Sequence, residues 1–153
     1  MSRSGARLAT AVAVVSLFSS TESGAQLLAP APKAPSVTIT APPTLEIAHD
    51  DTAIIRWTET NPGGADQHFA VANYGTEPGA LTQKAMSHIR LNRGHAETMF
   101  RVRLDNLQPS TKYYYTVTST EADGTADGVK SPVENFTMPP YGQRIVNYPQ
   151  PGK

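Results

Sequence analysis

The chain has 153 residues, and Lys plus Arg and Asp plus Glu are equal at 13 each, so the formal net charge at pH 7 is +0. That length suits one domain of ordinary size, and a second folded domain is not expected. A neutral chain has no long-range field that would draw it to nucleic acid or to an anionic membrane surface. The sequence contains no Cys, which excludes disulfides and a lipid-modified cysteine.

The first 25 residues have the order of an export signal. Arg3 and Arg7 supply positive charge, residues 8–18 are apolar, and small residues end at Ala25. A membrane anchor is the alternative, but this apolar run is well below the roughly 20 residues that span a bilayer. We therefore expect cleavage near Ala25, export to the periplasm or the exterior, and no membrane span in the mature chain.

The rest of the sequence divides by composition. Residues 26–35 are rich in Pro and Ala and predict a semi-extended linker. Residues 139–153 have the same character, and prolines exclude regular structure at their own positions. The intervening residues 36–138 are expected to form the one folded domain.

Apolar and polar residues alternate within this domain, and a period of two predicts strands and no helices. The clearest strand is TAIIRWT, which places Ala53, Ile55 and Trp57 on one face and Ile54 and Arg56 on the other. The remaining strands are expected at residues 36–39, ended by Pro42-Pro43, then at 44–47 as a brief edge segment, 68–74, 82–91, 98–104, 111–118 and 133–137.

One of these assignments depends on context. Residues 82–91 also fit a helix, and the all-β surroundings favour a strand. Asp123-Gly124 and Asp127-Gly128 predict a polar turn region before the last strand. About seven short strands separated by Gly, Pro and Asp turns predict an all-β fold, a two-sheet antiparallel sandwich of the immunoglobulin-like kind.

The segment LQPSTKY, from Leu107 to Tyr113, resembles the L-x-P-x-T-x-Y corner of fibronectin type III domains. The resemblance implies that Tyr113 buries its ring while its hydroxyl reaches a backbone group of the corner. Trp57 is similar to the core Trp of the same fold. The residues expected to form the structural core are Ile55, Trp57, Leu107, Pro109, Tyr113, Tyr115 and Val117.

A narrower resemblance covers residues 36–140. The stretches IRWT, NYGTEPG, FRVRLDNLQPSTKYYYTV and FTMPP resemble the non-catalytic N-terminal domain of purple acid phosphatases. In that family the domain precedes a metallophosphatase domain and contributes no ligands to the two-metal centre. The metal motifs of that enzyme (GDxG, GDxxY, GNH and GHxH) do not occur in this sequence. The resemblance therefore implies a chain that ends where the enzyme would begin.

No catalytic, cofactor-binding or metal-binding residue is predicted. Four histidines lack the close spacing with carboxylates that marks a metal motif, and a surface position is expected for each: His49, His68, His88 and His95. Glu121, Asp123 and Asp127 depart from the spacing of a calcium loop and are assigned to turn chemistry.

Two further features have ordinary structural explanations. Asn135-Phe136-Thr137 is a formal glycosylation sequon, but it falls in a predicted strand and is interpreted as structural. Arg56, Arg101 and Arg103 are expected on a solvated sheet face.

The sequence thus predicts a secreted, non-catalytic interaction or structural module whose partner is an unidentified protein or cell-surface polymer. One alternative is an accessory domain of a separately encoded metallophosphatase of the purple acid type. The other is a cell-surface or polysaccharide-binding module. The fold alone does not separate these functions.

Overall fold

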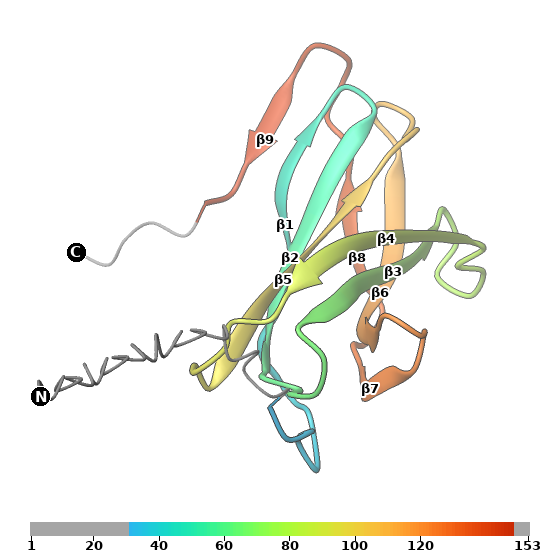
Figure 1. Cartoon of the computed structure of the whole chain (residues 1–153). Coiled ribbons are helices and arrows are strands. Elements are labelled where there is room, and N and C mark those ends of the chain that lie inside the picture. Colours follow the sequence, from blue (N-terminus) through green and yellow to red (C-terminus); the bar gives the residue numbers. More distant parts are fainter. Residues whose placement is uncertain (1–30, 149–153) are drawn as a thin grey trace, which may run out of the picture.

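The structure is a computed structural model that describes residues 31–148, so the expected signal segment and its cleavage site lie outside the described residues. Within this range every regular element is a strand, and no helix is long and apolar enough to cross a membrane. The nine strands (Figure 1) are β1 (Ile39–His49), β2 (Thr52–Thr60), β3 (Gln67–Gly75), β4 (Gln83–Arg90), β5 (Glu97–Leu104), β6 (Lys112–Glu121), β7 (Ala126–Lys130), β8 (Glu134–Thr137) and β9 (Arg144–Val146).

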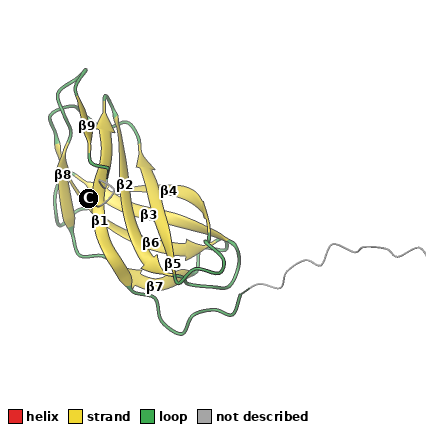
Figure 2. Ribbon diagram, turned by 90° about the vertical axis from the view of Figure 1, so that its left-hand side faces the viewer, coloured by secondary structure: helices red, strands yellow, loops and turns green. Residues whose placement is uncertain are grey.

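The strands form two antiparallel sheets that pack face to face (Figure 2). One sheet has the order β5-β2-β1-β9, and the other has the order β4-β3-β6-β7 with β8 also paired to β6. The predicted all-β, two-sheet antiparallel sandwich is confirmed. The number of strands is nine, against the expected seven or so.

Strand β1 does not end at the prolines, so the prediction of a first strand stopped by Pro42-Pro43 and a separate edge segment was wrong. The strand continues from Ile39 to His49, with register shifts against β2 on both sides of the two prolines. Proline lacks the N–H that a regular ladder requires, and a bulge is one of the few places where a strand accommodates it. The irregular register lets one strand run the full length of the sheet.

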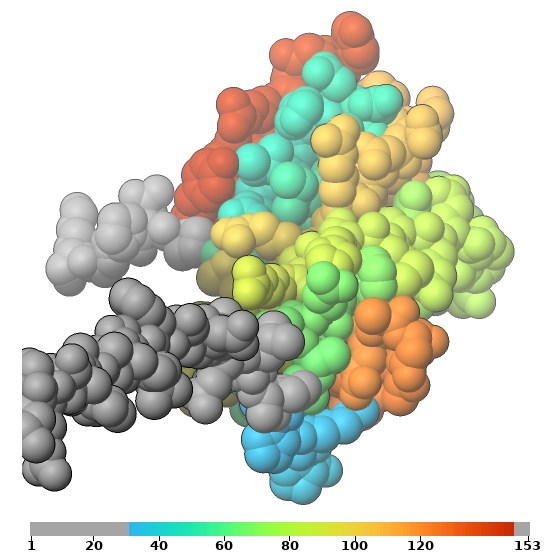
Figure 3. Space-filling model, in the orientation of Figure 1, coloured from blue at the N-terminus to red at the C-terminus, as the bar shows by residue number. Residues whose placement is uncertain are grey.

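Two short strands were not predicted. Strand β7 lies in the region assigned to polar turns and pairs with the end of β6 through an irregular register. Strand β9 lies in the Pro-rich tail and pairs with Ile47, Ala48 and His49 of β1. The described part of the tail, up to residue 148, lies beside the β1–β2 hairpin in the space-filling view (Figure 3). Strand β9 thereby covers backbone groups of β1 that an exposed sheet edge would offer to other chains.

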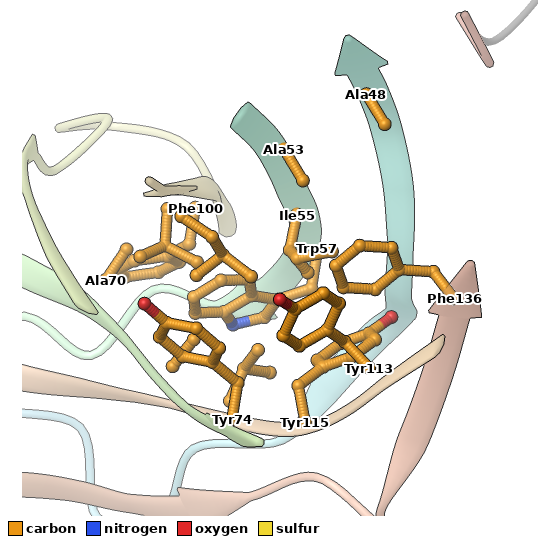
Figure 4. Packing of buried hydrophobic residues seen from close by; sticks show 14 of the residues in the cluster. Ala48, Ala53, Ile55, Trp57, Ala70, Tyr74, Phe100, Tyr113, Tyr115 and Phe136 are labelled. Atoms are coloured by element: carbon orange, nitrogen blue, oxygen red, sulfur yellow. The ribbon is translucent and has the colours of Figure 1, made fainter. Parts of the chain in front are cut away.

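The core between the sheets is built around aromatic rings (Figure 4). Trp57 of β2 stacks on Phe100 of β5 with ring centroids 5.5 Å apart, and Tyr113 of β6 stacks on Phe136 of β8 at 5.8 Å. Offset ring pairs of this kind stabilise a fold beyond the area they bury. The buried cluster includes six of the residues expected in the core, Ile55, Trp57, Leu107, Tyr113, Tyr115 and Val117, whereas Pro109 is half-buried at the surface.

The first described residues pack against one end of the sandwich, which we call the linker end. The N–H of Gly64 donates to the Ala31 carbonyl, and the N–H of Ala34 donates to the Pro62 carbonyl, both at 2.8 Å. A Cβ on Gly63 would lie 2.1 Å from the Pro32 carbonyl oxygen. Only glycine at this position therefore lets residues 31–34 approach so closely.

Candidate functional site

A group of polar side chains closes the core at the linker end. We call it the polar cluster, and its members are Glu59, His68, Ser119, Glu121 and Asp127. Strand alternation explains its composition, because the inward positions of β2, β3 and β6 are apolar along most of the sandwich and polar at this end. Strand β7 adds Asp127 from the sheet edge.

Glu59 is fully buried and both of its carboxylate oxygens accept hydrogen bonds. The indole Nε1 of Trp57 donates to Oε1 at 2.5 Å, and the hydroxyl of Ser119 donates to Oε2 at 2.7 Å. Burial raises the pKa of Glu59, the two hydrogen bonds lower it, and the charge of Asp127 raises it further. The net result is a carboxyl group with a raised pKa whose donors are both neutral.

His68 and Asp127 face each other without a hydrogen bond. His68 Nε2 lies 3.3 Å from Asp127 Oδ1, and both side chains are completely shielded from solvent. Both ring nitrogens of His68 and both oxygens of Asp127 lack a hydrogen-bond partner among the residues described. Buried polar groups are nearly always paired in folded proteins, so this arrangement requires an explanation.

Glu121 completes a set of three potential metal ligands. His68, Glu121 and Asp127 each offer one atom, and these atoms all lie within 4.8 Å of one another. Across residues 31–148 they are the one group of three or more His, Cys, Asp or Glu side chains with such spacing. The candidate site is therefore a mixed imidazole and carboxylate cluster on β3, β6 and β7.

A lysine from the preceding linker already contacts this cluster. The ammonium group of Lys33 donates a hydrogen bond to Glu121 Oε1, and its side chain remains 47 % exposed. This hydrogen bond raises the pKa of Lys33, burial lowers it by less, and the charges of Glu121, Asp127 and Asp123 raise it further. The cluster thus attracts a cation from the linker.

An open groove of about 630 Å³ lies toward the other end of the sandwich. Its walls come from β1, β2, β6, β8 and the tail, and they include Arg56, Tyr115, Glu134, Asn135 and Tyr148. The buried hydroxyl of Tyr115 donates to the Pro43 carbonyl at 3.2 Å. The groove has no convergent ligand set, and it lies apart from the polar cluster.

The histidine predictions had mixed outcomes. His49, His88 and His95 are exposed, as expected, whereas His68 is completely buried, so the surface position predicted for it was wrong. The reason is strand register, because His68 shares the inward face of β3 with Ala70, Ala72 and Tyr74. The alternation of β3 is visible in the sequence and is the signal that places His68 on the same face as Ala70 and Ala72.

The turn role predicted for the acidic residues near β7 holds for Asp123 and fails for Asp127. Asp123 Oδ1 accepts a hydrogen bond of 2.8 Å from the N–H of Thr125, which is the expected turn chemistry. Asp127 lies instead inside the strand β7, buried against His68. Turn chemistry was therefore the wrong explanation for Asp127.

The three arginines lie on one sheet face but differ in their contacts. Arg101 donates to both carboxylate oxygens of the buried Glu46, at 2.8 and 3.1 Å. Arg103 donates to Asp105 at 2.6 Å, and Arg56 lines the groove. Asn135 of the sequon is exposed on β8.

Comparison with known proteins gives a family. Residues 33–138 match the purple acid phosphatase N-terminal domain. A search of curated proteins found no match. Similar solved structures include the sensor domain of the anti-sigma factor RsgI4 of Pseudobacteroides cellulosolvens, with 15% identity, 69% of this chain and 75% of that chain covered, and a TM-score of 0.45.

Two further similar structures are the FN5 domain of Drosophila Lar and a computationally redesigned β-sandwich protein. The first has 18% identity over 65% of this chain and 96% of that chain, with a TM-score of 0.36. The second has 16% identity over 67% and 93%, with a TM-score of 0.33. The family match spans well over half of the sequence and coincides with strands β1 to β8. The chain therefore belongs to the family of purple acid phosphatase N-terminal domains, and its fold is a two-sheet antiparallel β-sandwich.

Proposed function

We propose that this chain is exported and acts outside the cytoplasm as a non-catalytic module that binds another macromolecule. The observation that supports this most is the family match over residues 33–138. The matched domain is the one that precedes the metallophosphatase domain in purple acid phosphatases, and it is not the part that carries the metals. In this proposal, the β-sandwich provides the surface that binds the other macromolecule.

The polar cluster supports the same proposal. Hydrolysis by a two-metal centre requires ligands for two ions about 4 Å apart, which together activate water and hold the phosphoryl group. His68, Glu121 and Asp127 offer one ligand atom each and are the one such group among residues 31–148. Three ligand atoms suit a single ion, which is consistent with the proposed non-catalytic role.

Export is proposed from the order of charge, apolar run and small residues before Gln26. The test is the intact mass of the protein recovered outside the cytoplasm of its own host or of a bacterial expression strain. A mass beginning at or within a few residues of Gln26 supports the proposal. Full-length chain beginning at Met1 in a membrane pellet contradicts it.

A second candidate function is that of an accessory domain that binds a separately encoded metallophosphatase. The family match favours it, because domains of this family lie beside such an enzyme. The test is co-purification from the secreted fraction, followed by a binding titration with the purified phosphatase. Saturable binding to that enzyme supports the accessory role, whereas retention on cell-wall polysaccharide favours a surface-binding module instead.

A further inference from the structure

The polar cluster contains buried polar atoms that have no hydrogen-bond partner among the described residues. Four polar atoms, two on His68 and two on Asp127, are buried together with no hydrogen-bond partner among residues 31–148. Folded proteins pair such groups with protein, water or metal. We propose that His68, Glu121 and Asp127 form a binding site for a single divalent cation, with zinc the best-suited ion.

The spacing of the ligand atoms fits one ion. Zinc bonds to imidazole nitrogen and carboxylate oxygen are about 2.0 to 2.2 Å long, which places two ligands of a tetrahedral ion about 3.4 Å apart. His68 Nε2 and Asp127 Oδ1 are 3.3 Å apart, and one ligand atom from each of His68, Glu121 and Asp127 lies within 4.8 Å of the other two. A small shift of the half-buried Glu121 side chain completes three-coordination and leaves the fourth position for water.

The chemistry of the ligands selects the ion. Imidazole suits zinc and related transition metals, whereas calcium and magnesium prefer sites made only of oxygen. Two carboxylates balance the charge of a divalent ion, and the low polarity around His68 and Asp127 strengthens that attraction. The site therefore favours zinc over the alkaline-earth ions.

The ligands come from three neighbouring strands. His68 on β3 is directly opposite Glu121 on β6, and Asp127 is on the adjoining strand β7. An ion held by all three connects the short strand β7 to the centre of its sheet. Its expected effect is structural, namely a more stable linker end.

The ammonium group of Lys33 would compete with the metal ion for the carboxylate of Glu121. Its ammonium group already contacts Glu121, and because its side chain is half exposed it can withdraw into solvent without disturbing the core. Metal binding then requires Lys33 to leave Glu121. Removal of the lysine charge should strengthen metal binding.

The test is a zinc titration of the purified, untagged chain after dialysis against a chelator, followed by calorimetry and thermal unfolding. We expect one ion per chain and a rise in Tm that saturates with zinc. Glu121→Gln should weaken binding at least tenfold, because it removes a charged ligand while leaving the side-chain size unchanged. Lys33→Met should tighten binding severalfold.

Asp123→Asn is the matched control. Asp123 is an exposed acidic residue in the turn between β6 and β7, and it is not one of the three proposed ligands. Its affinity for zinc should equal that of the parent. X-ray absorption of the zinc-loaded parent should show one imidazole and a remainder of oxygen ligands. This measurement uses the parent protein, so it tests the proposal even if a variant of a buried ligand fails to fold.

Three results would overturn the proposal. The first is the absence of saturable binding at one ion per chain. The second is an affinity of Glu121→Gln equal to that of the parent. The third is a zinc shell with no imidazole, which would place the ion on surface carboxylates.

Discussion

The phenolic oxygen of Tyr113 accepts a hydrogen bond of 2.9 Å from the backbone N–H of Gln108, five residues earlier in the chain. The ring of Tyr113 is buried in the core and stacks on Phe136. The Tyr113 side chain thus stabilises the turn before β6 through its hydroxyl and the aromatic core through its ring. This is the contact that the tyrosine corner resemblance implies.

Tyr113→Phe should lower the free energy of unfolding by about 1 kcal/mol, because it removes this hydrogen bond and leaves the ring packing intact. Tyr114→Phe is the control, since the neighbouring ring is half-buried and points to the opposite face of β6. Urea unfolding measures both. An equal effect of the two substitutions would show that the corner bond contributes nothing specific.

Trp57→Ala should cost about 3 to 5 kcal/mol, because it opens a large cavity against Phe100 and removes the donor to Glu59. Met99→Ala, on the solvent face of β5, should cost less than about 0.5 kcal/mol. The comparison uses urea unfolding in the presence of a chelator. Similar losses for the two variants would contradict the assignment of Trp57 to the centre of the core.

Glu59→Gln should stabilise the protein at neutral pH. Burial raises the pKa of Glu59 above its ordinary value of 4.5, so the folded state holds the proton more tightly than the unfolded state. Stability from this group is therefore present at low pH and is lost as the pH rises through the raised pKa. Glutamine retains both contacts, because its oxygen accepts from Trp57 and its amide nitrogen donates to Ser119.

Unfolding of the parent and of Glu59→Gln should be compared from about pH 4 to about pH 8, with a chelator present. The two should be similar at the acid end, and the variant should gain relative to the parent as the pH rises. A variant that is less stable than the parent at neutral pH would show that the carboxylate is ionised and well solvated by its donors.

Gly63→Ala should release residues 31–34 from the linker end. Its φ is +66°, and an added Cβ would collide with the Pro32 carbonyl oxygen. Gly94→Ala is the matched control, because its φ of +78° imposes similar backbone strain but its Cβ would meet nothing within 4 Å. Hydrogen exchange at the amides of Ala34 and Gly64 should rise in the first variant and not in the second. Unchanged protection in Gly63→Ala would contradict close packing of the linker.

Residues with a clear period of two were predictable, and those in irregular pairings were not. The faces of TAIIRWT and the inward position of Tyr113 follow from alternation and a local motif. Strand β7 contains two residues, Asp127 and Gly128, that are typical of turns, and only its pairing with β6 makes it a strand. Strand β9 has three residues and depends on the uncovered edge of β1.

The spacing of residues in the sequence does not predict the polar cluster. His68 is far from Glu121 and Asp127 in the chain, and the pairing of β3 with β6 brings it to them. Alternation on β3 identifies His68 as inward, but no feature of the sequence indicates that Asp127 faces it. The pairing of β7 with β6 is irregular, so alternation alone does not predict which residues of β7 face inward.

We propose that the chain is a non-catalytic domain, and an assay of phosphomonoester hydrolysis is the decisive test. Purified mature protein should be supplied with iron, zinc or manganese across about pH 4 to 8 and assayed with an aryl phosphate, since efficient hydrolysis requires a metal-activated water. We predict turnover no faster than that of a heat-denatured control, even when zinc is bound. Metal-dependent turnover that survives repurification and is abolished in Glu121→Gln or Asp127→Asn would show that the domain is catalytic.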